Sequence, residues 1–115
     1  MDYVLLVHGP SSAGDEVPAW AAAFLRICLR SGIPVSGQLL AADCIATSLL
    51  YSNGRTDIVD GPIEQTSRQL GACFTVECPH LDAVLELLRD APILEQGSVE
   101  IRPVDPVSQQ MWLAG

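Results

Sequence analysis

Two side chains beside chain-reversing residues have the chemistry to transfer a proton. His8 ends an apolar run and precedes Gly9, and Asp60 begins the triplet Asp-Gly-Pro. An imidazole at a strand end that faces a cleft suits acid–base chemistry near neutral pH, and a carboxylate can act as a base or anchor a ligand. The structural alternatives are that Asp60 bonds to the backbone of its own turn and that His8 is a half-buried strand-end residue. We take His8 and Asp60 as candidate catalytic residues.

Three further charged residues alternate with apolar ones in two predicted strands. Glu77 lies in one of these strands, and Glu100 and Arg102 lie in the other. Because successive strand side chains point to opposite faces, all three are expected on the polar face of one sheet. Arg102 could anchor a substrate beside a carboxylate base, or the three could form an ion-pair network that holds two subunits together. They are our candidate ligand-binding residues.

The expected strand order decides which candidates can meet. Antiparallel pairing brings Glu77 close to Tyr3 and Cys73 close to His8. At ~3.3 Å per residue, Glu77 and His8 are then on the order of 15 Å apart in one subunit, so they belong to different sites. His8 and Asp60 can form one site if the chain that precedes Asp60 folds back over that end of the sheet.

The cysteines and histidines do not have the spacing of a metal site. No Cys-x-x-Cys occurs, and the two His do not complete a zinc-like pattern. The Gly- and Ser-rich residues 9–14 lack the Lys of a phosphate-binding loop. We therefore expect no metal and no cofactor, and we expect the thiols to be reduced and mostly buried: Cys28, Cys44, Cys73 and Cys78.

The apolar pattern predicts the elements that must position these residues. Strands are expected over residues 3–7, 34–40, 71–78 and 98–104, and a hairpin is expected over 45–59 around its Asn-Gly turn. One helix is expected from a cap at Asp15, with the stripe Val17, Trp20, Phe24, Ile27 and Cys28, and a second with the stripe Leu81, Val84, Leu85 and Leu88. This order predicts one domain over residues 1–115 with a ferredoxin-like α+β fold, two helices on one face of an antiparallel sheet, and an inserted hairpin.

The first strand indicates a homodimer. It is apolar without alternation, which predicts burial on both faces, although the helices cover one face only. Hydrophobic residues make up 49% of the chain, which is high for a small monomer. A second copy of the sheet could cover the other face and close a dimeric α+β barrel with a cleft inside. We expect the tail over 105–115, with Met111, Trp112 and Leu113, to pack on its own subunit or on the partner.

The negative net charge argues against nucleic acids and anionic membranes as partners. The net charge is −8, there is no Lys, and the six Arg are scattered. Binding to nucleic acid or to an anionic membrane needs a basic surface, so we expect neither partner. The first residues lack the basic segment of a signal peptide, and the apolar helical stretch over 19–25 is too short to span a bilayer. The expected location is the cytoplasm.

Several segments resemble one known family. The sequence Thr-Asp-Ile-Val-Asp-Gly-Pro at 56–62 and Gly-Ser-Val-Glu-Ile-Arg-Pro-Val at 97–104 are similar, in order and spacing, to hallmarks of the YCII-related, DGPF-type family. Residues 1–7, 69–74 and 80–83 resemble its other elements. The resemblance implies a dimeric α+β barrel. The chain departs from the family at Ile63, where Phe is usual, and at Gln65, where an acid usually precedes Thr66. The His-Asp pair thought to act in some relatives has no His on the first helix here, so it does not carry over.

Two functions remain open at this point. The first is a small-molecule enzyme or binder, with proton-transfer chemistry of the lyase, isomerase or hydrolase kind in a cleft between two sheets. The second is a non-catalytic accessory or regulatory dimer. An open pocket with converging polar groups favours the first, and an interface filled by its own side chains favours the second.

Overall fold

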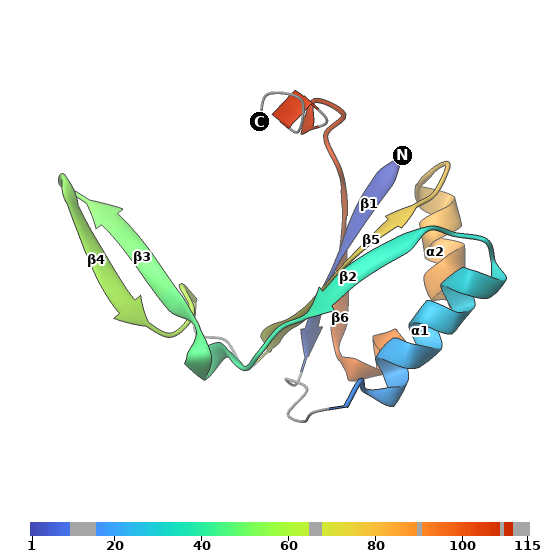
Figure 1. Ribbon diagram of the computed structural model, residues 1–115, viewed down its shortest axis with the longest axis horizontal. Helices are drawn as coiled ribbons and strands as arrows, with labels where there is room; N and C mark the ends of the chain where they lie inside the picture. The colour runs from blue at the N-terminus through green and yellow to red at the C-terminus, as the bar shows by residue number, and fades with distance from the viewer. Residues whose placement is uncertain (10–15, 65–67, 90, 109, 112–115) are drawn as a thin grey trace.

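The strand and helix segments assemble into a four-stranded antiparallel sheet of order β2-β5-β1-β6, with both helices on one face (Figure 1). The computed structural model describes residues 1–9, 16–64, 68–89, 91–108 and 110–111. The elements are β1 (Asp2–Gly9), α1 (Ala19–Arg30), β2 (Val35–Leu39), η1 (Asp43–Ile45), β3 (Thr47–Ser52), β4 (Arg55–Asp60), β5 (Gln69–Glu77), α2 (Leu81–Leu88), η2 (Pro92–Gln96) and β6 (Ser98–Pro103). The ferredoxin-like α+β fold expected from the sequence is confirmed.

The central strand β1 shows why the helices lie where they do. Tyr3, Leu5 and Val7 are buried under the helices, whereas Val4 and Leu6 on the other face are only half-buried. The run is apolar on both faces, as the sequence showed, but the helices of one copy complete the burial of one face only. Burial of apolar side chains is the main stabilising term of such a core.

The first helix packs on the sheet through an aromatic pair. The Phe24 and Phe74 rings lie with their centroids 5.2 Å apart and their planes tilted at 58°, an arrangement that favours ring edges against ring faces. Phe74 lies over β2 at Gly37, where an added Cβ would be 2.3 Å from the Phe74 ring. Helix α1 begins at Ala19, and Val17 precedes it and is exposed. The expected cap Asp15 lies outside the described residues.

The second helix is rotated relative to the expected stripe. Val84, Leu87 and Leu88 are buried, while Leu81 and Leu85 are exposed. Each residue turns a helix by about 100°, so the way the chain enters from β5 decides which of several Leu positions face the core. As expected, His80 helps to start this helix, and its Nδ1 accepts a hydrogen bond from the Ala83 backbone N–H at 3.2 Å.

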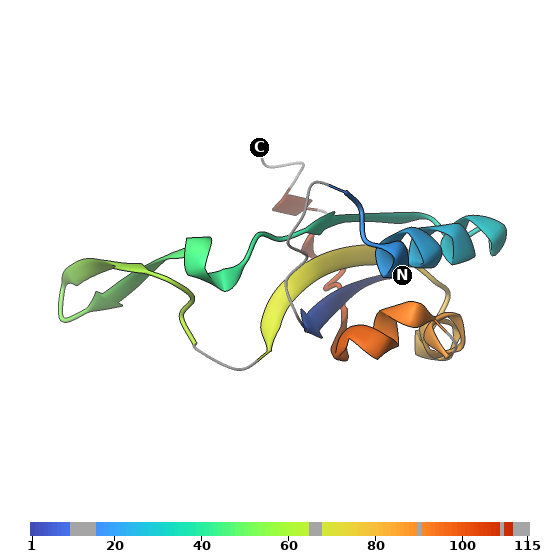
Figure 2. The ribbon, with the colours of Figure 1, turned by 90° about the horizontal axis from the view of Figure 1, so that it is seen from below.

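The hairpin β3–β4 forms at the predicted place but stands apart as its own two-stranded sheet. Asn53 and Gly54 have φ angles of 51° and 77° at its tip, as a tight hairpin turn requires. The hairpin projects on the side of the main sheet opposite the helices (Figures 1 and 2). The radius of gyration is consequently 16.2 Å, against about 13 Å for a compact domain of this length.

The chain leaves β6 through a short segment at the N-terminal end of β1. The Val104 backbone N–H donates to the Asp2 carbonyl at 2.9 Å, and the Val107 N–H donates to Oδ1 of Asp105 at 3.0 Å. Met111 is exposed, and Trp112 and Leu113 lie outside the described residues. Within the described part of the chain, no helix has both the length and the apolar character needed to cross a membrane.

Candidate functional site

The sheet face away from the helices, which we call the open face, carries most of the candidate residues. Strand register and alternation place the following side chains on it: Asp2, Val4, Leu6 and His8 of β1, Ser36 and Gln38 of β2, Cys73, Thr75 and Glu77 of β5, and Ser98, Glu100 and Arg102 of β6. Uncharged side chains occupy its centre, while the carboxylates, the imidazole and the guanidinium lie at its two ends and along β6. The polar face expected from the sequence therefore exists, and Glu77, Glu100 and Arg102 all lie on it.

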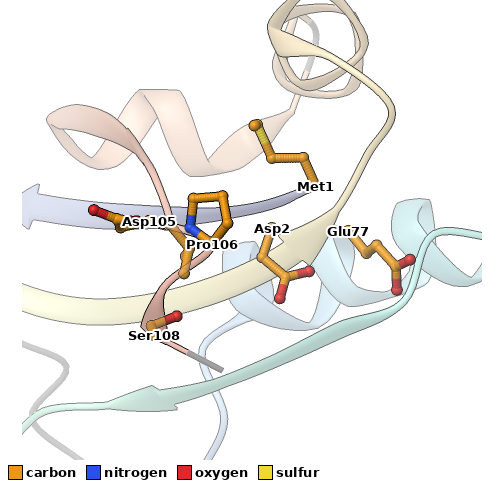
Figure 3. Close-up of a pocket in the computed structure, with 7 residues that line it drawn as sticks. Met1, Asp2, Glu77, Asp105, Pro106 and Ser108 are labelled. Carbon is orange, nitrogen blue, oxygen red and sulfur yellow. The ribbon is translucent and has the colours of Figure 1, made fainter. Parts of the chain in front are cut away.

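At one end of the open face, two carboxylates lie on adjacent strands. Glu77 pairs with Asp2, whereas the expected neighbour was Tyr3, one residue further along the strand. This difference matters because a one-residue shift in register moves a side chain to the other face of the sheet. Both carboxylates line an open pocket of about 220 Å³ (Figure 3) and a second pocket of about 240 Å³ beside it. The first pocket is completed by Met1, Val104, Asp105, Pro106 and Ser108, and the second by Pro34, Val35, Ser36 and Thr75.

The sequence did not single out Asp2 or Asp105 as site residues. The only signal for Asp2 was its place opposite Glu77, which depends on the register between two strands that are far apart in the chain. Like charges placed directly opposite on neighbouring strands are destabilising. Ionised carboxylates are hydrogen-bond acceptors only, so this end of the face is suited to a ligand that offers hydrogen-bond donors.

His8 lies at the other end of the open face. Its Cα is paired with Leu70 of β5 and with Ser98 of β6, next to a bulge between Val7 and His8. Arg68 Nη1 donates a hydrogen bond to the Ser98 hydroxyl. His8 is half-buried. Because Glu77 pairs with Asp2, about six residues of strand separate it from His8, or on the order of 20 Å, so the two lie at opposite ends of one copy.

Arg102 and Glu100 interact with each other on the exposed edge strand β6. Their side-chain atoms Nη1 and Oε2 are 3.6 Å apart, and both side chains are largely exposed. An exposed pair of this kind contributes roughly 0–1 kcal/mol to stability. The pair therefore leaves both groups close to solvent, where they remain within reach of a ligand or of another subunit.

Asp60 lies at the base of the hairpin and is exposed, with its Cα paired to Thr47. Within the Asp-Gly-Pro triplet, it is Gly61 that bonds to the hairpin. The Gly61 N–H donates to the Ala46 carbonyl at 2.7 Å, its carbonyl accepts from the buried Ser48 hydroxyl at 2.7 Å, and its φ of 111° suits glycine. The triplet thus closes the hairpin, and Ser48 is a buried polar partner that the sequence did not indicate.

The hairpin does not fold back over the His8 end of the sheet in one copy, because it projects away from the sheet (Figure 1). Its base is tied to β5 by a hydrogen bond from the Asp43 N–H to Gln69 Oε1 at 2.9 Å. The condition under which His8 and Asp60 would form a single site within one subunit is therefore not met.

The four cysteines are free thiols. Burial raises the pKa of the Cys28 thiol to about 11, with a smaller contribution from neighbouring Cys78, and burial also raises the pKa of Cys78. Both are therefore protonated at neutral pH and unsuited to nucleophilic chemistry. Cys44 is exposed and Cys73 half-buried. Over the described ranges, no group of three or more His, Cys, Asp or Glu residues is placed to hold a metal ion.

Comparison with known proteins gives the family but no activity. An uncharacterised protein of Rhizobium meliloti (strain 1021) is 36% identical over 61 residues, and the aligned segment covers 51% of this chain and 49% of the relative. The chain thus matches about half the length of that relative. The model of the YCII-related domain matches residues 1–108, from before the first strand to beyond the last. The chain belongs to the YCII-related family.

Proposed function

We propose that this protein binds a small molecule in a cleft between the open faces of two copies and transfers a proton to or from it. The observation that carries the proposal is the Asp2–Glu77 carboxylate pair, which lies where two open pockets meet on an otherwise uncovered sheet face. Lyase, isomerase and hydrolase reactions all use such proton transfers, with a carboxylate or an imidazole as the base.

The uncovered face supports the homodimer. Val4 and Leu6 lie at its centre and are only half-buried in one copy, and burial of such apolar surface favours association. The two pockets of about 220 and 240 Å³ are open and smaller than the 300–1,000 Å³ or so of typical ligand sites. A second copy would close and enlarge them. Dimers of this kind are most often symmetric, so each would have two equivalent sites.

The candidates have separate roles in this proposal. Glu77 binds the ligand together with Asp2 and serves as the proton acceptor, and Arg102 and Glu100 lie along the rim of the same face. His8 is the acid–base group at the far end of the face, and Asp60 remains a second candidate on the hairpin. We infer a cytoplasmic location, which the four free thiols support, since such a compartment keeps thiols reduced.

A thermal-shift screen of small molecules against Glu77→Gln and wild type tests the proposal. We expect at least one compound to raise the melting temperature of wild type and of the control Glu95→Gln, an exposed carboxylate on η2, but not of Glu77→Gln. A ligand that binds only the folded state at 100 times its Kd adds about 2.7 kcal/mol of stability, which is readily measured. Equal shifts in all three proteins would remove Glu77 from the site.

The alternative function is a non-catalytic accessory or regulatory dimer. The small size of each pocket and the projecting hairpin favour it, because they indicate surfaces for protein contact. A broad screen in which no compound stabilises wild type, together with a stable dimer in solution, would support this function over the first.

A further inference from the structure

The hairpin β3–β4, residues 47–60, which we call the arm, has an apolar face that the rest of the described chain leaves exposed. Leu49 pairs with Ile58, and Tyr51 lies two residues along the same strand, so the three share a face. Their exposed fractions are 64%, 74% and 76% in that order. An isolated two-stranded hairpin is at best marginally stable in water, so a projecting arm with such a face is expected to pack on something.

Among the described residues of one copy, no element outside the arm covers its apolar face. It stands on the side of the sheet opposite the helices, away from the core (Figures 1 and 2). Its base is fixed by the hydrogen bonds of Gly61 with Ala46 and Ser48 at 2.7 Å each. The open face of the sheet is on the same side as the arm, and its centre is apolar and half-buried. Two apolar surfaces of one chain thus face the same side without covering each other.

We propose that the arm of each copy packs its apolar face, Leu49, Tyr51 and Ile58, against a second copy of this chain. In a two-fold dimer, each copy gives an arm and receives one, so both arms are covered by the same association. The inference deepens the proposed homodimer and rests on it, since it names the surface by which the two copies hold each other.

The charge of the arm fits a second copy. The chain carries a net charge of −8, so two copies repel each other over most of their surface. Between residues 45 and 63 the charged residues are only Arg55, Asp57 and Asp60, a net charge of −1. The arm is therefore a part of the surface on which two acidic chains can meet with little repulsion.

The arms supply part of the area that a stable dimer needs. Leu49, Tyr51 and Ile58 lie on one face of the arm, and their exposed fractions together equal about two fully exposed side chains. At 1.5–3 kcal/mol per buried side chain and roughly 25 cal/mol per Å², this is on the order of 200 Å² per arm. Two arms, each covering a similar area of the partner, bury on the order of 800 Å², and the apolar centre of the open face adds to this towards the roughly 1,600 Å² of a standard specific interface.

Sedimentation equilibrium over a range of concentrations tests the proposal with Ile58→Lys. This change lowers the net negative charge, so added repulsion between copies cannot explain a loss of the dimer. The control is Leu29→Lys on α1, at a residue that is 75% exposed. We expect wild type and Leu29→Lys to have twice the 12.3 kDa mass of the chain. The dimer dissociation constant of Ile58→Lys should be at least about tenfold higher than theirs, because this change removes a central apolar residue from both copies.

Two results would overturn the inference, and they are distinguishable. If Ile58→Lys dimerises as tightly as wild type, the arm is not in the interface and the homodimer stands without it. If wild type stays monomeric at every concentration, both the arm inference and the proposed homodimer fail, and another partner must cover the arm. Should circular dichroism show Ile58→Lys unfolded, Leu49→Thr replaces it, because a β-branched residue keeps the strand propensity.

Discussion

Removing one charge from the Asp2–Glu77 pair should stabilise the protein. The two residues are directly paired on adjacent strands, and like charges in that position cost roughly 0.2–1 kcal/mol. Both side chains are exposed, so water keeps the repulsion within that range. Glu77→Gln or Asp2→Asn should therefore raise the free energy of unfolding by up to about 1 kcal/mol, which corresponds to about 2 to 6 °C in melting temperature for a domain of this size.

Urea denaturation at low salt and at about 1 M salt measures the effect. The Debye screening length is roughly 3 Å at the higher salt, so most of the gain in stability should disappear there. The variant Asp2→Asn/Glu77→Gln should be scarcely more stable than either single variant, since each removes the same repulsion. Glu95→Gln serves as the control and should have little effect. A Glu77→Gln protein that is no more stable than wild type, or a gain that persists in high salt, would refute the electrostatic account of this pair.

A stabilising substitution at this pair would also bear on function. Proteins tend to retain unfavourable local arrangements where a site needs them, and substitutions that relieve them often reduce activity. If Glu77→Gln both raises stability and abolishes ligand binding, the carboxylate pair is best explained as a binding feature.

Three further substitutions test particular contacts. Ser48→Ala removes the buried hydroxyl that bonds to Gly61 and should increase hydrogen exchange of the Gly61 amide, with a loss of about 1 kcal/mol at the hairpin base. Gly37→Ala places a Cβ against the Phe74 ring and should lower the free energy of unfolding by about 1–3 kcal/mol in urea denaturation. In wild type, the buried Cys28 thiol has a pKa raised from 9.0 to about 11, so stability is fully present below pH 9 and about 2–3 kcal/mol should be lost as pH rises towards 11. Cys28→Ala should lack that share of the loss, and the share from the raised pKa of Cys78 should remain.

Each of these tests has a control on the same element or of the same type. Ser52→Ala, at the exposed end of β3, should leave the Gly61 amide protected from hydrogen exchange. Gln38→Ala, whose side chain lies on the open face beside Gly37 in sequence, should change the free energy of unfolding little. Cys44→Ala, at an exposed thiol, should keep the full alkaline loss of stability. Equal behaviour of any variant and its control would contradict the contact assigned to it.

The residue pattern predicted the class of the fold and the face of each strand. Alternation in β5 and β6 placed Glu77, Glu100 and Arg102 on one face because side chains point to opposite sides with a period of two. The Asn-Gly turn predicted the hairpin, because few residues tolerate the positive φ angles at its tip. These signals are local, so a single sequence is enough to read them.

Only the tertiary structure decided which residues meet. The register that pairs Glu77 with Asp2 depends on contacts between strands far apart in the chain, and a shift of one residue would have put Tyr3 there instead. The rotation of α2, which buries Leu87 and exposes Leu85, and the outward direction of the hairpin, which separates Asp60 from His8, depend on how whole elements pack. Local propensity therefore set the elements and the faces of the strands, while long-range packing set the buried face of α2 and the site.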